Sequence, residues 1–179
     1  MSKQRDCIDQ ELTNWLGEQH IFFVATAPLS KQGHVNCSPK GGDSFRVLGP
    51  LEVAYQDYTG SGAETMAHLR ENERIVLMFC AFIGKPDIVR LHGTGEVITP
   101  DDPLFGTIAG HFPPNPGTRA VVHVRVTRVS TSCGYAVPFM EYQKERETLD
   151  KWAAAKGENA LQEYRAAKNA QSIDGLAAF

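Results

Sequence analysis

The sequence predicts an α+β protein whose centre is a small antiparallel β-barrel. Six or seven short runs of β-type residues follow one another between residues 20 and 130, and helical patterns flank them at both ends. The turns between most of these runs are too short for the crossovers that parallel strands require. A chain of 179 residues suits one domain. We expect the barrel at about 20–133 and a helical segment at about 140–179.

The first half of the chain contains most of the predicted strands. Apolar residues at helical spacing predict a helix within 6–19 that Gly17 ends. A second helix is expected to begin near Ser61 and to end near Asn72. Aromatic and β-branched runs bounded by turn residues predict strands over 20–27, 33–38, 45–48, 51–56 and 74–82. The last of these is almost entirely apolar, so we expect both of its faces to be covered.

The second half of the chain is expected to end in helices. A strand over 88–98 contains Gly93 and Gly95, which permit a bulge. A short helix over 101–110, capped by Asp101, and a proline-rich loop separate it from a strand over 120–130. Helical spacing then predicts helices over 141–156 and 158–168, with Gly157 ending the first of them.

The composition indicates a soluble globular protein of the cytoplasm. Apolar residues make up 42% and charged residues 22%, and the net charge of −3 argues against a nucleic-acid-binding protein. No apolar run approaches the roughly 20 residues needed to cross a membrane, and the polar N-terminus does not resemble a signal peptide. The four cysteines have no metal-ligand spacing, so we expect free thiols and no metal site.

Two segments carry the residues from which we predict a binding site. In residues 35–42 a strand runs into a glycine-rich turn with Lys40 at the junction, and in residues 57–65 a strand passes through two glycines into a helix. Backbone N–H groups and the helix dipole favour an anion at such a helix start, above all a phosphate. Lys40 would supply the opposite charge and anchor the phosphate, while Ser61 and Thr65 would supply hydroxyl donors.

Each of these segments also has a purely structural interpretation. Ser61 and Glu64 match a capping box, in which each residue bonds the backbone N–H of the other. The carboxylate of Glu64 would then repel a phosphate. Lys40 alone is typical of a solvated surface lysine. From these residues both interpretations stay open.

The order of these motifs resembles a known family. The matching segments are FFVATAPLS, HVNCSPKGGDSFRVLGP, VAYQDYTGSGAET, HLRENERIVLMFCAF and IVRLHGTGEV, which lie in this order between Phe22 and Ile98. They resemble the FMN-binding split-barrel family typified by pyridoxamine 5′-phosphate oxidase, and more closely its relatives than the oxidase itself. The segment that begins at Ser132 and the SIDGL motif at residues 172–176 are similar to one subgroup of those relatives.

The resemblance implies a six-stranded antiparallel split β-barrel that forms a homodimer, with one FMN in each of two clefts at the subunit interface. In that family, the strand that ends in lysine lies along the flavin ring and ribityl chain, and the helix start binds the phosphate. Carried over to this chain, the cofactor-binding residues are Asn36, Cys37, Ser38, Lys40, Tyr58, Thr59, Ser61, Gly62, Thr65 and Arg90.

Three departures from the oxidase itself bear on the substrate. The basic pair that the oxidase has at the phosphate-binding helix start is Glu64-Thr65 here, and Ile88 replaces its glutamine. The C-terminal Arg-x-His segment that binds substrate has no counterpart. The resemblance therefore extends to the flavin but not to the oxidation of vitamin B6.

The function predicted by the resemblance is that of an FMN-dependent oxidoreductase acting on a small molecule. The flavin performs the redox chemistry, and no side chain is assigned as acid or base. Substrate and electron acceptor stay open. The alternatives are a non-catalytic module for flavin or haem, the latter with His92 or His111 as axial ligand, and an enzyme that uses a deazaflavin. The acidic balance of the chain favours FMN over a deazaflavin, whose longer phosphate-bearing tail requires more basic residues.

Overall fold

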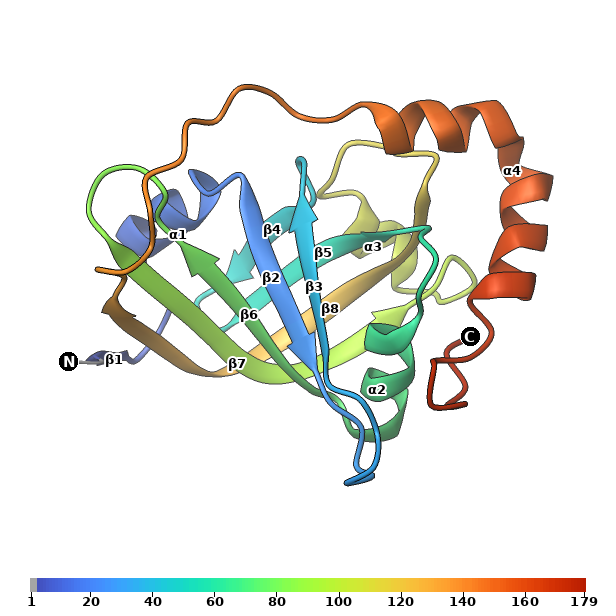
Figure 1. The fold of residues 1–179 in the computed structure, drawn as a ribbon, viewed down its shortest axis with the longest axis horizontal. Coiled ribbons are helices and arrows are strands. Elements are labelled where there is room, and N and C mark those ends of the chain that lie inside the picture. Colours follow the sequence, from blue (N-terminus) through green and yellow to red (C-terminus); the bar gives the residue numbers. More distant parts are fainter. Residues whose placement is uncertain (1–2) are drawn as a thin grey trace.

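One curled antiparallel sheet forms the centre of the molecule, as the computed structural model shows for residues 3–179 (Figure 1). Its strands follow the order β3-β2-β6-β7-β8-β5-β4, and β1 pairs with β8. The strands are β1 (Lys3–Arg5), β2 (Ile21–Thr26), β3 (Asn36–Gly41), β4 (Phe45–Gly49), β5 (Glu52–Tyr58), β6 (Arg74–Cys80), β7 (Asp87–Ile98) and β8 (Thr118–Cys133). The predicted class, an antiparallel split barrel with flanking helices, is confirmed; β1 is a strand that no sequence pattern indicated.

Four helices flank the sheet, namely α1 (Gln10–Gly17), α2 (Glu64–Asn72), α3 (Phe105–Ala109) and α4 (Thr148–Lys168). The backbone of Gly157 is non-helical, with φ 73° and ψ 167°, and kinks α4 at the predicted break. Within residues 3–179 no helix has both the length and the apolar composition needed to cross a bilayer.

One predicted helix cap is wrong, and the capping box that was left open as an alternative does not form. α3 begins at Phe105, and the side chain of Asp102 rather than Asp101 accepts a hydrogen bond from the N–H of Leu104. The capping box at Ser61 does not form, because α2 begins after Ala63 and no side chain caps it. Its intended partner, Glu64, accepts instead from the N–H of Ile173 near the C-terminus.

The core lies inside the curl of the sheet. Phe22 of β2 stacks on Phe79 of β6 with ring centroids 5.2 Å apart, and it meets Tyr55 of β5 edge-on at 5.8 Å. All three side chains are almost fully buried, as the period of two along a strand requires. On the opposite face of β6, Val76 and Met78 are only half-buried. Within one chain, only one face of β6 is buried, although the sequence predicted that both of its faces would be.

A bulge between β7 and β8 bends the long strands. Their register shifts between His92 and Gly93, which confirms the predicted role of this glycine. A Cβ atom on Gly93 would lie 2.1 Å from the carbonyl oxygen of Arg125. The backbones of the two strands approach each other more closely here than any side chain allows.

We predict that Gly93→Ala destabilises the protein by about 1–3 kcal/mol, because the added methyl group forces β7 away from β8. Gly17→Ala is the matched control, since nothing lies within 4 Å of its Cβ position. Urea unfolding followed by far-UV circular dichroism measures both variants. Equal stability of Gly93→Ala and the wild type would show that the strands can separate at no cost.

Candidate functional site

The two segments predicted to form a binding site lie against each other. Lys40 Nζ on β3 donates to Asp57 Oδ1 on β5 at 2.5 Å. Asn36 Nδ2, four residues earlier on β3, donates to Thr65 Oγ1 in the first turn of α2 at 2.9 Å. The predicted convergence of the two strand ends is therefore present in the structure.

Asp57 is the centre of this junction. Its side chain is fully buried, and its second oxygen accepts from Arg119 Nε at 2.6 Å. Burial raises the pKa of Asp57, but the charges and hydrogen bonds of Lys40 and Arg119 outweigh burial and hold this pKa below its ordinary value. The carboxylate is therefore ionised at neutral pH and balances part of the surrounding positive charge.

A second bulge turns Arg119 toward Asp57. In the pairing of β5 with β8, Asp57 faces Ala120 whereas the next residue, Tyr58, faces Thr118. Arg119 therefore has no partner across the ladder, and its side chain is free to turn inward, where it is 6% exposed. Bulges commonly redirect a side chain in this way.

The loop that precedes α2 is anchored to β8 and α4. Arg119 Nη1 donates to the carbonyl of Gly62 at 2.8 Å. The buried hydroxyl of Thr59 donates to the carbonyl of Gly117 at 2.9 Å and accepts from Arg165 Nε at 2.8 Å. Ser61, by contrast, is exposed at the tip of this loop. Hydrogen bonds from distant segments thus fix the backbone on both sides of Ser61.

A chain of polar side chains runs from β3 to α2. Ser38 Oγ donates to Asn36 Oδ1 at 3.1 Å, and Asn36 Nδ2 also lies 3.5 Å from the hydroxyl of Thr26. This hydroxyl is 2.9 Å from Nδ1 of His68, which is fully buried on α2. Burial lowers the pKa of His68. The neutral ring fixes the tip of β3 at α2.

A cavity of about 680 Å³ adjoins Lys40. Its lining includes His20, the β3 end from Pro39 to Gly42, Ser44, Gln56, Tyr58, Pro113, Asn115, Lys144, Arg146 and Asp150. Tyr58 Oη donates to Gln56 Oε1 at 3.1 Å. Burial, with the nearby charge of Asp150, raises the pKa of Tyr58 to about 12, so its phenol remains a neutral donor at pH 7. The cavity offers a ligand cationic, hydroxyl and amide groups.

The structure places two predicted residues elsewhere. Cys37 is exposed on β3, and Arg90 lies on β7, where its Nη1 donates to Ser132 Oγ at 3.1 Å. Arg90 pairs with Met78 and Met78 with Phe23, so two whole strands separate Arg90 from β3. That separation corresponds to roughly 14 Å. Of the ten predicted cofactor-binding residues, Lys40 and Tyr58 line the cavity beside Lys40, and the other eight do not. The two histidines considered for haem do not line it either.

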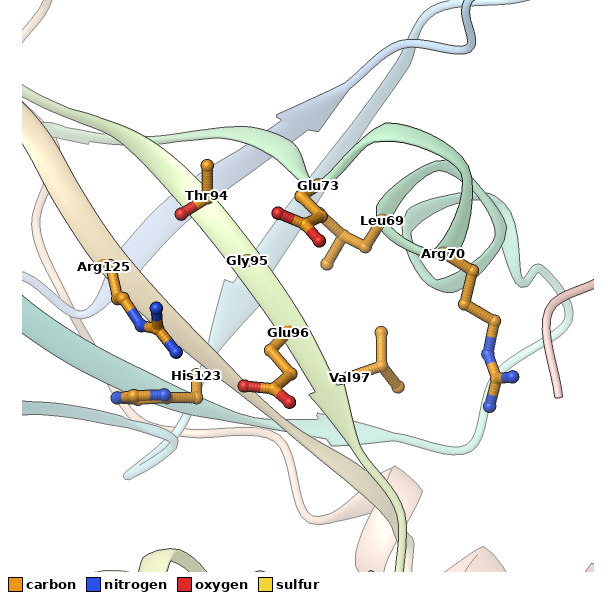
Figure 2. A pocket seen from close by; sticks show the side chains of 9 residues that line it. All are labelled: Leu69, Arg70, Glu73, Thr94, Gly95, Glu96, Val97, His123 and Arg125. Carbon is orange, nitrogen blue, oxygen red and sulfur yellow. The ribbon is translucent and has the colours of Figure 1, made fainter.

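A second cavity, of about 400 Å³, lies between α2, β7 and β8 (Figure 2). Arg125, His123 and Glu96 approach one another on one side of it, whereas Arg70 extends away from them. His123 Nε2 is 2.6 Å from Glu52 Oε1. The lining contains none of the residues predicted for the site and mixes charges of both signs, so it favours no particular ligand.

Sequence reasoning missed three side chains of this junction: Arg119, Arg165 and His68. Arg119 falls in the polar phase of the β8 pattern, which predicts an outward side chain, and only the bulge reverses it. Arg165 lies on α4, far along the chain from Thr59, so no local pattern links the two. His68 follows Thr65 by three residues, and this helical spacing was the one available signal.

Comparison with known proteins gives consistent matches. The family model of pyridoxamine 5′-phosphate oxidase matches residues 8–133. The pyridoxamine 5′-phosphate oxidase family protein ustO of Aspergillus flavus is 39% identical over 190 residues, which covers 96% of this chain and 75% of that protein.

Two solved structures share the fold. HupZ of Group A Streptococcus matches with a TM-score of 0.52 and 23% identity, over 68% of this chain and 91% of its own. A FAD-binding protein of Mesorhizobium loti matches with a TM-score of 0.50 and 14% identity, over 73% of this chain and 96% of its own.

We predict that Asp57→Asn lowers the free energy of unfolding by about 3–5 kcal/mol, because it leaves two buried cations without their carboxylate. Since the pKa of Asp57 is lowered in the folded state, its contribution is present above the unfolded pKa of about 4 and is lost as the pH falls through the folded value. Urea unfolding from pH 3 to pH 8 measures both effects. If the wild type and Asp57→Asn showed the same stability at pH 7, Asp57 would not hold the junction together.

Proposed function

Because this chain belongs to the pyridoxamine 5′-phosphate oxidase family, we propose that it is an FMN-binding flavoprotein and an FMN-dependent oxidoreductase acting on a small organic molecule. The observation that carries this proposal is the contact of two glycine-bearing strand ends, through Lys40–Asp57 and Asn36–Thr65, beside a cavity of about 680 Å³. Pockets for cofactors are ordinarily of this size, at roughly 300–1,000 Å³.

The groups around the cavity fit a flavin. A flavin ring carries carbonyl and nitrogen acceptors, its ribityl chain carries hydroxyls, and its tail ends in a phosphate. Lys40 has three N–H donors and gives only one of them to a protein acceptor within residues 3–179. Gly42 has a φ of 69°, a conformation that favours glycine and lets the β3 turn expose its backbone to a ligand. The cavity thus offers the ammonium group of Lys40, the phenol of Tyr58 and the amides of Gln56 and Asn115 to such a ligand.

We assign the residues of the chain to parts of the cofactor. Asn36, Ser38 and Lys40 on β3, with the neutral phenol of Tyr58, hold the ring and ribityl chain. This assignment replaces the predicted role of Lys40 as phosphate anchor, because its ammonium group is bonded to Asp57, whereas Asn36 is the β3 residue that reaches α2. The loop and first turn of α2, with Ser61, Gly62 and Thr65, receive the phosphate. A bound flavin would supply hydride or electron transfer, and the protein would orient it and tune its potential through hydrogen bonds. The FAD-binding structural relative supports a flavin ligand, and the net charge of −3 favours FMN over a deazaflavin.

A homodimer with the cofactor clefts at its interface completes the proposal. The outward face of the sheet presents the half-buried side chains of Phe23, Val76 and Met78. Near it, the segment that leads to α4 exposes Phe139 by 84% and Tyr135 by 85%. Apolar side chains exposed together mark an interaction surface. A second copy of the chain would cover them and provide the second layer that β6 lacks.

We predict that the purified protein is yellow, with flavin absorption bands, and that mass spectrometry of the released ligand identifies FMN. Lys40→Ala weakens binding of both FMN and riboflavin at least tenfold, because charge-assisted hydrogen bonds contribute about 1.5–3 kcal/mol. Lys31→Ala, at an exposed turn, is the matched control. Fluorescence titration measures all affinities.

Three outcomes would contradict parts of this proposal. If the purified protein is colourless and does not bind added flavin, the proposal that it is a flavoprotein is contradicted. If Lys40→Ala binds FMN and riboflavin as tightly as the wild type does, Lys40 does not contact the flavin. Flavin binding without turnover of reduced nicotinamide or another reductant would reduce the protein to a binding module, and a Soret band would make haem its ligand.

We predict that the wild type sediments at twice the chain mass of 19.7 kDa and that Met78→Glu sediments as a monomer. A charge at this half-buried position would be costly to cover with a second copy. Thr107→Glu, exposed on α3, leaves the dimer intact. Analytical ultracentrifugation distinguishes the species, and a monomeric wild type would contradict the shared cleft.

A further inference from the structure

We propose that a third cavity, between the start of β2 and the segment 134–147, binds the substrate, and that this substrate is a flat apolar molecule with an amino group. This inference rests on the proposed function, since the molecule would be the small organic substrate of that reaction. It defines the substrate class by charge, as a cationic amine and not a phosphate ester or a carboxylate.

The cavity has a volume of about 680 Å³ and largely apolar walls. Three parts of the chain build it: residues 18–23, the hairpin between β6 and β7, and the segment 134–147, which is orange in Figure 1. The N–H of Met140 donates to the carbonyl of Phe82 at 3.1 Å and attaches the segment to the hairpin. The apolar side chains of the lining are Ile21, Phe23, Phe82, Ile83, Met140 and Tyr142.

Most of the segment's contribution lies outside the part of the chain that matches the family model. That match ends at residue 133, whereas Met140, Glu141, Tyr142 and Glu145 all line the cavity. Ile83 is 65% exposed and Met140 54% exposed, so both present apolar surface that a ligand would remove from water. The cavity is therefore a feature of this chain that the shared barrel does not provide.

The apolar cavity adjoins the cavity beside Lys40. His20, Ile21 and Glu145 line both of them. The ring of His20 stacks on that of Tyr142, with centroids 3.6 Å apart and an interplanar angle of 10°. A molecule in the apolar cavity would therefore lie next to a flavin in the cavity beside Lys40, as a reaction between the two requires.

Apart from the imidazole of His20, the titratable acids and bases of the apolar cavity are all carboxylates. Glu18, Glu141 and Glu145 line it, and no lysine or arginine of residues 3–179 does so. The cations of the segment, Lys144 and Arg146, line the cavity beside Lys40 instead. The segment thus supplies only negative charge to the apolar cavity.

Neighbouring cations do not neutralise these carboxylates. Glu145 Oε1 accepts a hydrogen bond from Tyr142 Oη at 3.0 Å, and no ion pair in the described chain includes any of the three glutamates. In the adjoining hairpin, Lys85 is paired with Asp87 Oδ2 at 2.9 Å. An ammonium group would therefore meet carboxylates and aromatic faces, both of which attract it. A phosphate or carboxylate would be repelled.

A small amine suits this cavity better than a second copy of the chain. Phe23 belongs both to the cavity and to the outward sheet face that we assign to the dimer, so the cavity lies at the edge of that face. The chain is itself acidic, with a net charge of −3, and covering three unpaired carboxylates with it would bury charge without a partner. A small cation pairs with the same carboxylates while they stay in contact with water.

The test uses three probes that share one ring system: naphthylmethylamine, naphthylmethanol and naphthoate. Calorimetry measures their binding to the full chain loaded with FMN. We expect the amine to bind about fivefold more tightly than the alcohol, and naphthoate to bind most weakly, because only the charge differs between the probes. We also expect the amine to shift the flavin absorption bands, since the two cavities adjoin.

Variants of the segment locate the binding. Glu141→Gln weakens the amine about threefold and leaves the alcohol unchanged, and Glu141→Lys brings the amine and naphthoate within about twofold of each other. Met140→Ser weakens all three probes by a similar factor of about three, because it removes only apolar wall. Glu163→Gln, exposed on α4 and outside both cavities, is the matched control and binds the probes as the wild type does.

The outcomes separate this inference from the proposed function. Equal affinity of the wild type for the amine and naphthoate overturns the amine site, and so does the failure of every probe to bind, as it would if a second copy filled the cavity. Amine binding that is unchanged in Glu141→Lys, or that leaves the flavin spectrum unaltered, overturns it as well.

If the protein does not bind FMN, the proposed function fails while the cavity can still be tested. The probes are then titrated into the flavin-free chain. A preference for the amine that is lost in Glu141→Lys and kept in Glu163→Gln supports an amine site even then. If that preference is absent, both proposals fail.

Discussion

A buried carboxylate determines how this barrel closes. Asp57 has no access to solvent, so its charge has to be paired inside the protein or the fold would lose several kcal/mol. Its two partners come from β3, at one end of the strand order, and from β8, in the middle of the sheet. The open side of the curled sheet is therefore closed by an ion pair between β3 and β5 and not by a further ladder of backbone hydrogen bonds.

The position of the candidate site follows from this closure. Lys40 brings β3 to the end of β5, where Arg119 links Asp57 to Gly62 in the loop before α2. The polar chain from Ser38 to His68 fixes the other half of β3 to that helix. The cavity beside Lys40 lies where a strand end, a turn and a loop meet around one buried charge. Such a junction is held by side chains, which leaves the backbone groups of the turn available to a ligand.

The sequence predicted the fold better than the site because the two depend on different kinds of information. Local runs of β-type residues identify strands, and seven of the eight strands overlap such a run, whether it alternates or, as in β6, is almost entirely apolar. β1 has only three residues and was missed. Lys40 and Thr65 stood out because glycines next to them mark a turn and a helix start. Arg119 and Arg165 did not, since one depends on a bulge in a ladder and the other on the docking of α4. Local patterns cannot reveal either relation.

The contacts of Glu64 show why the structural interpretation of this segment, a capping box, does not apply in the folded chain. Ser-x-x-Glu is a good local capping motif, and as an isolated peptide this segment would use it. In the folded chain the C-terminal segment supplies a better partner, the N–H of Ile173, and Asn169 and Arg165 bind the loop from the same side. These contacts from α4 and the residues after it hold the loop and the Glu64 side chain, but none of them accepts from an N–H group in the first turn of α2. The conformation of the loop consequently depends in part on residues more than 100 positions away. The C-terminal helix is for this reason part of the candidate site and not an appendage of the barrel.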